Sequence, residues 1–199
     1  MTVSIAILAK APVVGFAKTR LIPAIGAHAA AVLQERLTEQ TVATASAAGM
    51  GAVTLWCTPD LSHRSFHALV AGFGVRLTRQ PDGDLGARML AAFAGPTLVI
   101  GTDCPALTSQ HLRAAADALH QADVVLIPAT DGGYVLIGAR KTYPNLFAGI
   151  AWGTDTVLAE TRQRVAALGL KAIELAPLWD VDTEADLCRM ERELPALVL

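Results

Sequence analysis

The sequence predicts a single α/β domain, a three-layer α/β/α sandwich built around a mostly parallel sheet. Short, continuous apolar runs of strand length alternate along the chain with segments whose apolar residues recur every three or four positions. Continuous apolar runs are typical of strands buried on both faces of a parallel sheet, and their alternation with helical patterns indicates βαβ units. The length of 199 residues fits one domain, 1–199, because domains commonly contain about 100–200 residues.

Seven strands and five helices are expected. Four strongly apolar runs predict buried strands at Val3–Ala9, Ala52–Cys57, Thr97–Gly101 and Val124–Pro128. Three weaker runs predict further strands at Val75–Thr78, Tyr134–Gly138 and Ala172–Leu175. Helical spacing of apolar residues occupies the intervening stretches 30–41, 85–93, 112–119, 157–168 and 187–194.

The composition excludes several classes of protein. With 53% hydrophobic and 17% charged residues, the chain has ample apolar material for a core and is not generally disordered. A formal net charge of −2 provides no basic surplus for nucleic acid. The longest uncharged stretch, residues 41–59, is interrupted by glycine and proline, so no membrane span is expected. The first apolar run precedes Lys10 instead of following a basic segment, which is the wrong order for a signal peptide. We therefore expect a cytoplasmic protein.

The segment after the first strand is basic. Ligands of open α/β sheets bind beyond the carboxyl ends of the strands, so residues that follow each strand are candidates for function. Lys10, Lys18 and Arg20 lie within eleven residues, around Gly15. Lysine offers a point charge and arginine a planar fork for phosphate oxygens, whereas glycine lets the backbone approach. The alternative is a solvated basic loop. The pattern is not a P-loop, because residue 17 is alanine.

A carboxylate follows the fourth strand. Asp103 comes directly after a buried run, where a charge is costly unless something pairs with it. A Mg²⁺ ion bound with phosphate oxygens is the favoured partner, and hydrogen bonds to turn amides are the alternative. Cys104 is not predicted as a nucleophile, because no base is evidently paired with it. The three cysteines are far apart and predict neither disulfides nor a zinc site.

The remaining strand ends carry glycines and acids. Asp84 is a candidate N-cap in the stretch 80–89, and Asp131 precedes two glycines that form either a ligand contact or a hairpin turn. Thr154 or Asp155 is expected to cap the next helix. Other expected helix caps are Thr108, and Thr183 together with Asp186, which leaves Asp180 and Asp182 to face the strand ends.

Together these segments resemble the glycosyltransferase-A-like superfamily of nucleotide-diphosphosugar transferases. The resemblance covers nearly the whole chain and is strongest to a family of mostly uncharacterised bacterial members and to 2-phospholactate guanylyltransferases. Its most specific pieces are Lys18-Thr19-Arg20-Leu21, the stretch 101–107, Asp131-Gly132-Gly133-Tyr134, and Asp180-Val181-Asp182-Thr183 with Asp186-Leu187. The resemblance implies the Rossmann-like glycosyltransferase-A (GT-A) fold.

The resemblance also implies roles for matched residues. The first loop would hold nucleotide phosphates through Lys10, Gly15, Lys18 and Arg20, with Lys18 and Arg20 supporting catalysis. The implied metal ligands are Asp103 and Asp182, binding Mg²⁺ or Mn²⁺. The implied base and ribose contacts are Gln80, Gly83 and Gly86. The first loop departs from the glycine-rich loop of typical nucleotidyltransferases, and a full DxD triplet is missing.

Three functions follow as hypotheses. The first is metal-dependent nucleotidyl transfer from a nucleoside triphosphate to a small phosphorylated acceptor, with release of pyrophosphate; three cations in one loop suit a triphosphate. The second is glycosyl transfer from a nucleotide sugar, with Asp131 as the base that activates the acceptor. The third is nucleotide binding without catalysis. The sequence specifies neither the base, nor the acceptor, nor the oligomeric state.

Overall fold

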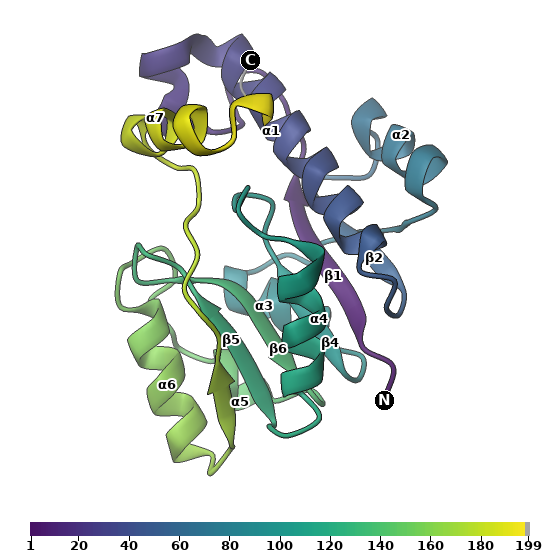
Figure 1. The fold of residues 1–199 in the computed structure, drawn as a ribbon, viewed down its shortest axis with the longest axis vertical. Coiled ribbons are helices and arrows are strands. Elements are labelled where there is room, and N and C mark those ends of the chain that lie inside the picture. The colour runs from purple at the N-terminus through teal and green to yellow at the C-terminus, as the bar shows by residue number, and fades with distance from the viewer. Residues whose placement is uncertain (198–199) are drawn as a thin grey trace.

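The computed structural model describes residues 1–197, which form one seven-stranded sheet flanked by helices (Figure 1). The strand order is β3-β2-β1-β4-β6-β5-β7. Only β6 runs antiparallel to its neighbours β4 and β5; the other pairs are parallel. The strands are β1 (Ser4–Lys10), β2 (Val53–Thr58), β3 (Arg76–Arg79), β4 (Thr97–Ile100), β5 (Val124–Pro128), β6 (Tyr134–Ala139) and β7 (Ala172–Glu174). All seven predicted strands are confirmed.

The helices cover both faces of the sheet and confirm the three layers. They are α1 (Ile22–Ala47), α2 (Arg64–Phe73), α3 (Leu85–Ala91), α4 (Ser109–Ala118), α5 (Pro144–Phe147), α6 (Val157–Ala167) and α7 (Glu184–Glu193), with 3₁₀ turns at Thr19–Leu21 and Pro195–Leu197. Within residues 1–197, no helix has the length and apolar character needed to cross a membrane.

Alternation along β1 divides the core into two layers. Ile5 and Ile7 pack on one face with residues of α1, α2 and α4, whereas Ala6 packs on the other face with residues of α3, α5 and α6. Successive side chains of a strand point to opposite faces, so continuous burial requires both layers of helices. This arrangement explains why the buried strands are apolar at nearly every position.

A third apolar cluster fixes the C-terminal segment on α1. Leu33 and Leu37 of α1 pack with Val181 and with Leu187 of α7, away from the sheet. In Figure 1 the segment after β7 runs beyond the edge of the sheet and brings α7 beside the first half of α1. The residues between β7 and α7 are thereby held above the carboxyl ends of the strands.

Most predicted helix caps are present. Asp84 accepts a hydrogen bond from the Ala87 amide (2.8 Å), and Thr108 and Thr183 each form a capping box. The predicted cap of α6, Thr154 or Asp155, is wrong. Thr156 occupies the N-cap position, and its side chain forms no capping hydrogen bond. Thr154 instead donates to the Ala151 carbonyl (2.7 Å). Helices α2 and α5 were not predicted; α5 is a single turn, too short for a periodic pattern.

Substitution of Gly138 in β6 tests how closely the side chains pack against the sheet. A Cβ at Gly138 would lie 2.5 Å from Leu98 Cδ2 and 2.6 Å from Val125 Cγ1, and both side chains are fully buried. We expect Gly138→Ala to lower the free energy of unfolding by about 1–3 kcal/mol, since overpacked cores must shift. Urea unfolding measures this. Gly72→Ala in α2 is the matched control, because nothing lies within 4 Å of its Cβ, and it should stabilise by about 0.5–1 kcal/mol. Equal effects of the two substitutions would contradict the packing described for β6.

Candidate active site at the carboxyl edge of the sheet

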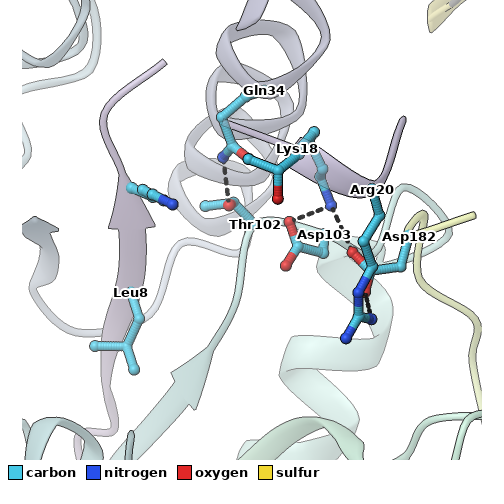
Figure 2. Close-up of a pocket in the computed structure, with 9 residues that line it drawn as sticks. Leu8, Lys18, Arg20, Gln34, Thr102, Asp103 and Asp182 are labelled. Atoms are coloured by element: carbon cyan, nitrogen blue, oxygen red, sulfur yellow. Dashed lines mark hydrogen bonds and ion pairs between the residues drawn. The ribbon is translucent and has the colours of Figure 1, made fainter. Parts of the chain in front are cut away.

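Three segments that are far apart in sequence meet above the carboxyl ends of the strands. They are the loop after β1, the turn after β4, and the chain between β7 and α7. The Val181 amide donates to the Asp103 carbonyl (2.9 Å), which joins the second segment to the third. Figure 2 shows Lys18, Asp103 and Asp182 converging at this point. Residues predicted as phosphate and metal ligands are therefore brought together.

Lys18 forms the centre of this cluster. Its side chain is only 4% exposed, and its ammonium lies 2.7 Å from Asp103 Oδ1 and 3.7 Å from Asp182 Oδ1. The same Nζ donates to the Val181 carbonyl (2.6 Å). Lys18 also has a left-handed backbone (φ 45°), a conformation that a lysine adopts only when its surroundings impose it. The backbone strain and the three oxygen contacts indicate a tightly constrained residue.

The other two cations of the first loop differ in their pairing. Arg20 Nη1 lies 2.6 Å from Asp182 Oδ2, although the Arg20 side chain is 71% exposed. Lys10 is exposed at the end of β1 and forms no ion pair within residues 1–197. Two of the three cations predicted to bind phosphate thus contact the predicted metal ligands, and their phosphate roles stay predictions.

These cations and carboxylates share one open cavity of about 230 Å³. Gln34 of α1 forms part of its wall and donates from Nε2 to Thr102 Oγ1 (2.9 Å) (Figure 2). Sequence reasoning missed Gln34 and Thr102; the available signal was a glutamine within the apolar face of a helix. The lining residues are Leu8, Lys10, Lys18, Thr19, Arg20, Gln34, Thr102, Asp103 and Asp182. We call this space the basic cavity.

A smaller, acidic cavity of about 120 Å³ adjoins it and shares Asp103. Asp131 and Asp180 line it as well. Burial and the nearby carboxylates of Asp131, Asp103 and Asp182 raise the pKa of Asp180 to about 6. Burial disfavours the charged form, and like charges add to the effect. Asp180 was not among the predicted site residues, because only the fold brings the other acids near it.

Asp131 lies in the turn between β5 and β6. Its Oδ1 accepts a hydrogen bond from the Gly133 amide (2.9 Å), so the hairpin-turn alternative is correct for the local structure. Gly132 has a φ of +94°, and a Cβ there would collide with the Asp155 backbone. The Leu158 amide donates to the Gly132 carbonyl (2.9 Å). The turn is thus packed against the loop before α6 while the Asp131 carboxylate faces the acidic cavity.

The remaining predicted ligands lie outside this cluster. Gln80 is buried and donates to the carbonyls of Trp56 (2.8 Å) and Ala9 (3.2 Å), so its amide holds β1 and β2. Gly86 packs against the Trp152 ring, 2.7 Å from where a Cβ would lie. Gly83 accepts from Arg88 Nε (3.1 Å), and Gly15 forms an exposed turn (φ +83°). None of these four lines the basic cavity, and their contacts with a nucleotide stay predictions.

The donor set is compatible with a divalent cation. Asp103 and Asp182 each direct a carboxylate oxygen to within 3.7 Å of the Lys18 nitrogen, so a positive charge already lies between them. Mg²⁺ commonly binds one or two carboxylates and completes its shell with water and substrate phosphates. Within residues 1–197, no three His, Cys, Asp or Glu side chains form a protein-only metal cluster. The residues thus fit a site that a substrate would complete.

Comparisons with known proteins show that the fold is shared. A protein from Desulfovibrio desulfuricans G20, named provisionally as a nucleotide-diphospho-sugar transferase, is 27% identical, with a TM-score of 0.85 over 98% of this chain and 90% of that one. A nucleotidyl transferase from Methanothermobacter thermautotrophicus is 15% identical (TM-score 0.67, 98% of both chains). Rv0371c from Mycobacterium tuberculosis, solved with manganese, is 18% identical (TM-score 0.57; 98% of this chain, 100% of that one).

The fold defines the class of protein. This is the fold of nucleotide-diphosphosugar transferases, which confirms the predicted superfamily and the prediction of an enzyme of the transferase class. A family model described as "uncharacterized protein conserved in bacteria (DUF2064)" matches residues 41–154, and the chain belongs to that family. Among curated proteins, no sequence matches this chain.

Because Lys18 is buried and Arg20 is exposed, we expect their substitutions to change the stability of the protein by different amounts. We expect Lys18→Met to lower the free energy of unfolding by about 1–3 kcal/mol, because it leaves the Val181 carbonyl without its donor and the carboxylates without their buried counterion. Arg20→Met is the matched control, and it should cost no more than about 1 kcal/mol, since exposed ion pairs contribute little. Urea unfolding of both variants measures the difference. If Arg20→Met proved the more damaging, Lys18 would not be the residue that holds the cluster together.

The raised pKa of Asp180 predicts an unusual dependence of stability on pH. The pKa of Asp180 is raised on folding, so the native protein binds this proton more tightly than the unfolded chain does. The contribution of Asp180 to the free energy of unfolding therefore falls as the pH rises from about 4 to 6. We expect Asp180→Asn to be more stable than the natural protein by about 1–2 kcal/mol at pH 8 and equal to it near pH 4. Urea unfolding of chelator-treated protein at pH 4 and pH 8 measures this difference in stability. Asp117→Asn, at an exposed position, should show no such crossover.

Proposed function

We propose that residues 1–199 act as one domain that catalyses divalent-metal-dependent nucleotidyl transfer from a nucleoside triphosphate to a small acceptor. The observation that supports this most is the basic cavity, in which three cations adjoin two carboxylates at the carboxyl edge of the sheet. Open α/β sheets bind ligands at this edge. Likeness to a nucleotidyl transferase and to a synthetase solved with CTP supports a nucleotide substrate.

Lys10 is the first residue that we assign to phosphate binding. It is the cation of the basic cavity that has no ion-pair partner within residues 1–197. Arg20 is exposed and could exchange its contact with Asp182 for one with phosphate at little cost, since exposed ion pairs are weak. Asp103 and Asp182 would hold Mg²⁺ or Mn²⁺, which when bound neutralises charge on the phosphates. Lys18 keeps these two carboxylates close together.

The chemistry requires no protein nucleophile. An acceptor oxygen would attack the α-phosphorus, a P–O bond would form, and the bond from the α-phosphorus to the bridging oxygen would break to release pyrophosphate. Asp131 would take the proton of the acceptor oxygen. Its Oδ1 is engaged by the Gly133 amide, which leaves Oδ2 for that proton. The protein contributes orientation, charge neutralisation and a base.

Glycosyl transfer from a nucleotide sugar is the second candidate. It is favoured by the pairing of Lys18 and Arg20 with Asp103 and Asp182, which leaves fewer free cations than a triphosphate would use. The protein of known structure at 27% identity also carries the name of a nucleotide-diphospho-sugar transferase. In this reaction the acceptor oxygen would bond to the anomeric carbon of the sugar and lose its proton to Asp131, while the bond from that carbon to the phosphate oxygen breaks and a nucleoside diphosphate leaves.

Product analysis distinguishes these functions. The full chain would be incubated with Mg²⁺ or Mn²⁺, a set of nucleoside triphosphates and nucleotide sugars, and a mixed set of small acceptors. We expect pyrophosphate from a triphosphate, and loss of turnover in Asp103→Asn. Release of a nucleoside diphosphate from a nucleotide sugar would replace the first reaction with the second. Nucleotide binding without turnover over the whole set would instead favour the non-catalytic hypothesis.

Lys10→Ala tests the phosphate site directly. Loss of a charge-assisted contact is worth about 1.5–3 kcal/mol, so nucleotide affinity should fall roughly 10- to 150-fold. Because Lys10 is exposed and unpaired within residues 1–197, the melting temperature of the free protein should not change. Isothermal titration with a nucleoside triphosphate and Mg²⁺ measures the affinity. Lys171→Ala, an exposed lysine beside β7, is the matched control. Unaltered affinity in Lys10→Ala would contradict the assignment.

A further inference from the structure

A third and larger cavity, of about 460 Å³, continues from the two cavities of the candidate site. It shares Arg20 and Asp182 with the basic cavity, and Asp131 with the acidic cavity. The three spaces therefore border the same residues along one edge of the sheet. A substrate in the basic cavity and a second molecule in this one would meet beside Asp131 and Asp182. We call the third space the outer cavity.

The charge of the outer cavity differs from that of the basic cavity. Three aspartates, Asp131, Asp155 and Asp182, line it, together with one arginine. That arginine is Arg20, whose guanidinium is paired with Asp182 at 2.6 Å. Its lining includes neither lysine nor histidine. In the proposed function Arg20 turns to the nucleotide phosphates, so a phosphate group of a second molecule in this space would meet the carboxylates of Asp131 and Asp155, and like charges repel.

The lining of the outer cavity also includes aromatic and apolar side chains. Trp152 and Tyr134 line the outer cavity, and Leu85 is 44% exposed at the start of α3. The Trp152 ring is held against Gly86, where any Cβ would lie 2.7 Å from the ring. Its indole Nε1 is buried and has no hydrogen-bond partner within residues 1–197. An exposed leucine, a tryptophan packed against Gly86 and three aspartates give the lining both apolar and hydrogen-bonding character.

We propose that the outer cavity binds the acceptor of the transfer reaction, and that this acceptor is an uncharged, hydroxyl-rich molecule such as a sugar or a polyol. Its hydroxyls would donate to the carboxylates of Asp131 and Asp155, and its C–H faces would pack on Trp152, since the face of an aromatic ring is electron-rich. One hydroxyl would thereby lie beside Asp131, the base of the proposed function, on which this inference rests. The acceptor differs from the phosphorylated one that the sequence predicted.

The test uses the whole chain labelled with 5-fluorotryptophan, which carries three reporters at Trp56, Trp152 and Trp179. The Trp152 signal is assigned by its disappearance in Trp152→Phe. The probes are glucose, galactose, ribose and glycerol, each compared with its monophosphate ester, and glucosamine compared with glucose. Titration is followed by ¹⁹F NMR in the presence of Mg²⁺ and a nucleoside diphosphate.

We expect at least one neutral probe to shift the Trp152 signal saturably, and its phosphate ester to bind at least about 10-fold more weakly, a difference of about 1.4 kcal/mol. Asp155→Asn should reduce this discrimination roughly 3- to 10-fold, because one repelling carboxylate is removed. Asp117→Asn, an exposed acid on α4 away from all three cavities, should leave the discrimination unchanged.

Three results would overturn the inference: a phosphate ester that binds as well as its neutral partner, glucosamine that binds more tightly than glucose, or no shift of the Trp152 signal by any probe. Nucleotide affinity is measured in parallel with the natural protein and Lys10→Ala. A nucleotide that fails to bind while a neutral probe still shifts Trp152 counts against the proposed function alone. A nucleotide that binds normally beside an unresponsive Trp152 counts against the acceptor site alone.

Discussion

The ammonium of Lys18 is the interaction on which the rest of the site depends. It binds oxygens from the turn after β4 and from the segment between β7 and α7, and it reaches them from the loop after β1. Two aspartates facing each other would repel in the absence of a cation. With Lys18 between them they hold their segments together, and the apolar contacts of Val181 and Leu187 with α1 can form. A strained lysine backbone is tolerated because these contacts compensate for it.

Charge is distributed unevenly along the edge of the sheet. Three cations line the basic cavity, aspartates without a lysine line the acidic cavity, and aspartates, aromatic residues and Arg20 line the outer cavity. Such a gradient orients a ligand before any close contact forms, because an anionic group is attracted to one end and repelled from the other. Two molecules of different charge can then occupy neighbouring spaces in a defined order. Under the proposed function, this distribution of charge would favour transfer from an anionic donor to a neutral acceptor.

The local sequence pattern was sufficient to predict the strands, because continuous apolar runs indicate burial directly. The N-caps at Asp84 and Thr108 could be predicted from the hydrogen-bonding chemistry of their side chains. The short helix α5 has too few residues for a periodic signal. The sequence predicted that Lys18, Arg20, Asp103 and Asp182 lie at the carboxyl edge of the sheet, and the structure brings them together there, while their roles stay predictions. The sequence could not indicate which of them contact one another. Lys18 and Val181 are 163 positions apart, and no spacing rule predicts that the lysine of the loop after β1 contacts the aspartate after β4. For the same reason, Asp180 was expected to face the strand ends but was given no role.

The separation of 163 positions between Lys18 and Val181 also bears on how the protein acquires its activity during synthesis. Domains begin to fold while the ribosome is still extending the chain, and β1, β2 and β4 can pair long before residue 181 has been made. A nascent chain at that stage already carries the basic loop, yet it lacks Asp182. Under the proposed function, such a chain would bind nucleotide weakly and could not turn it over. The candidate site would therefore be completed only after residues 181–187 have been made and pack on α1.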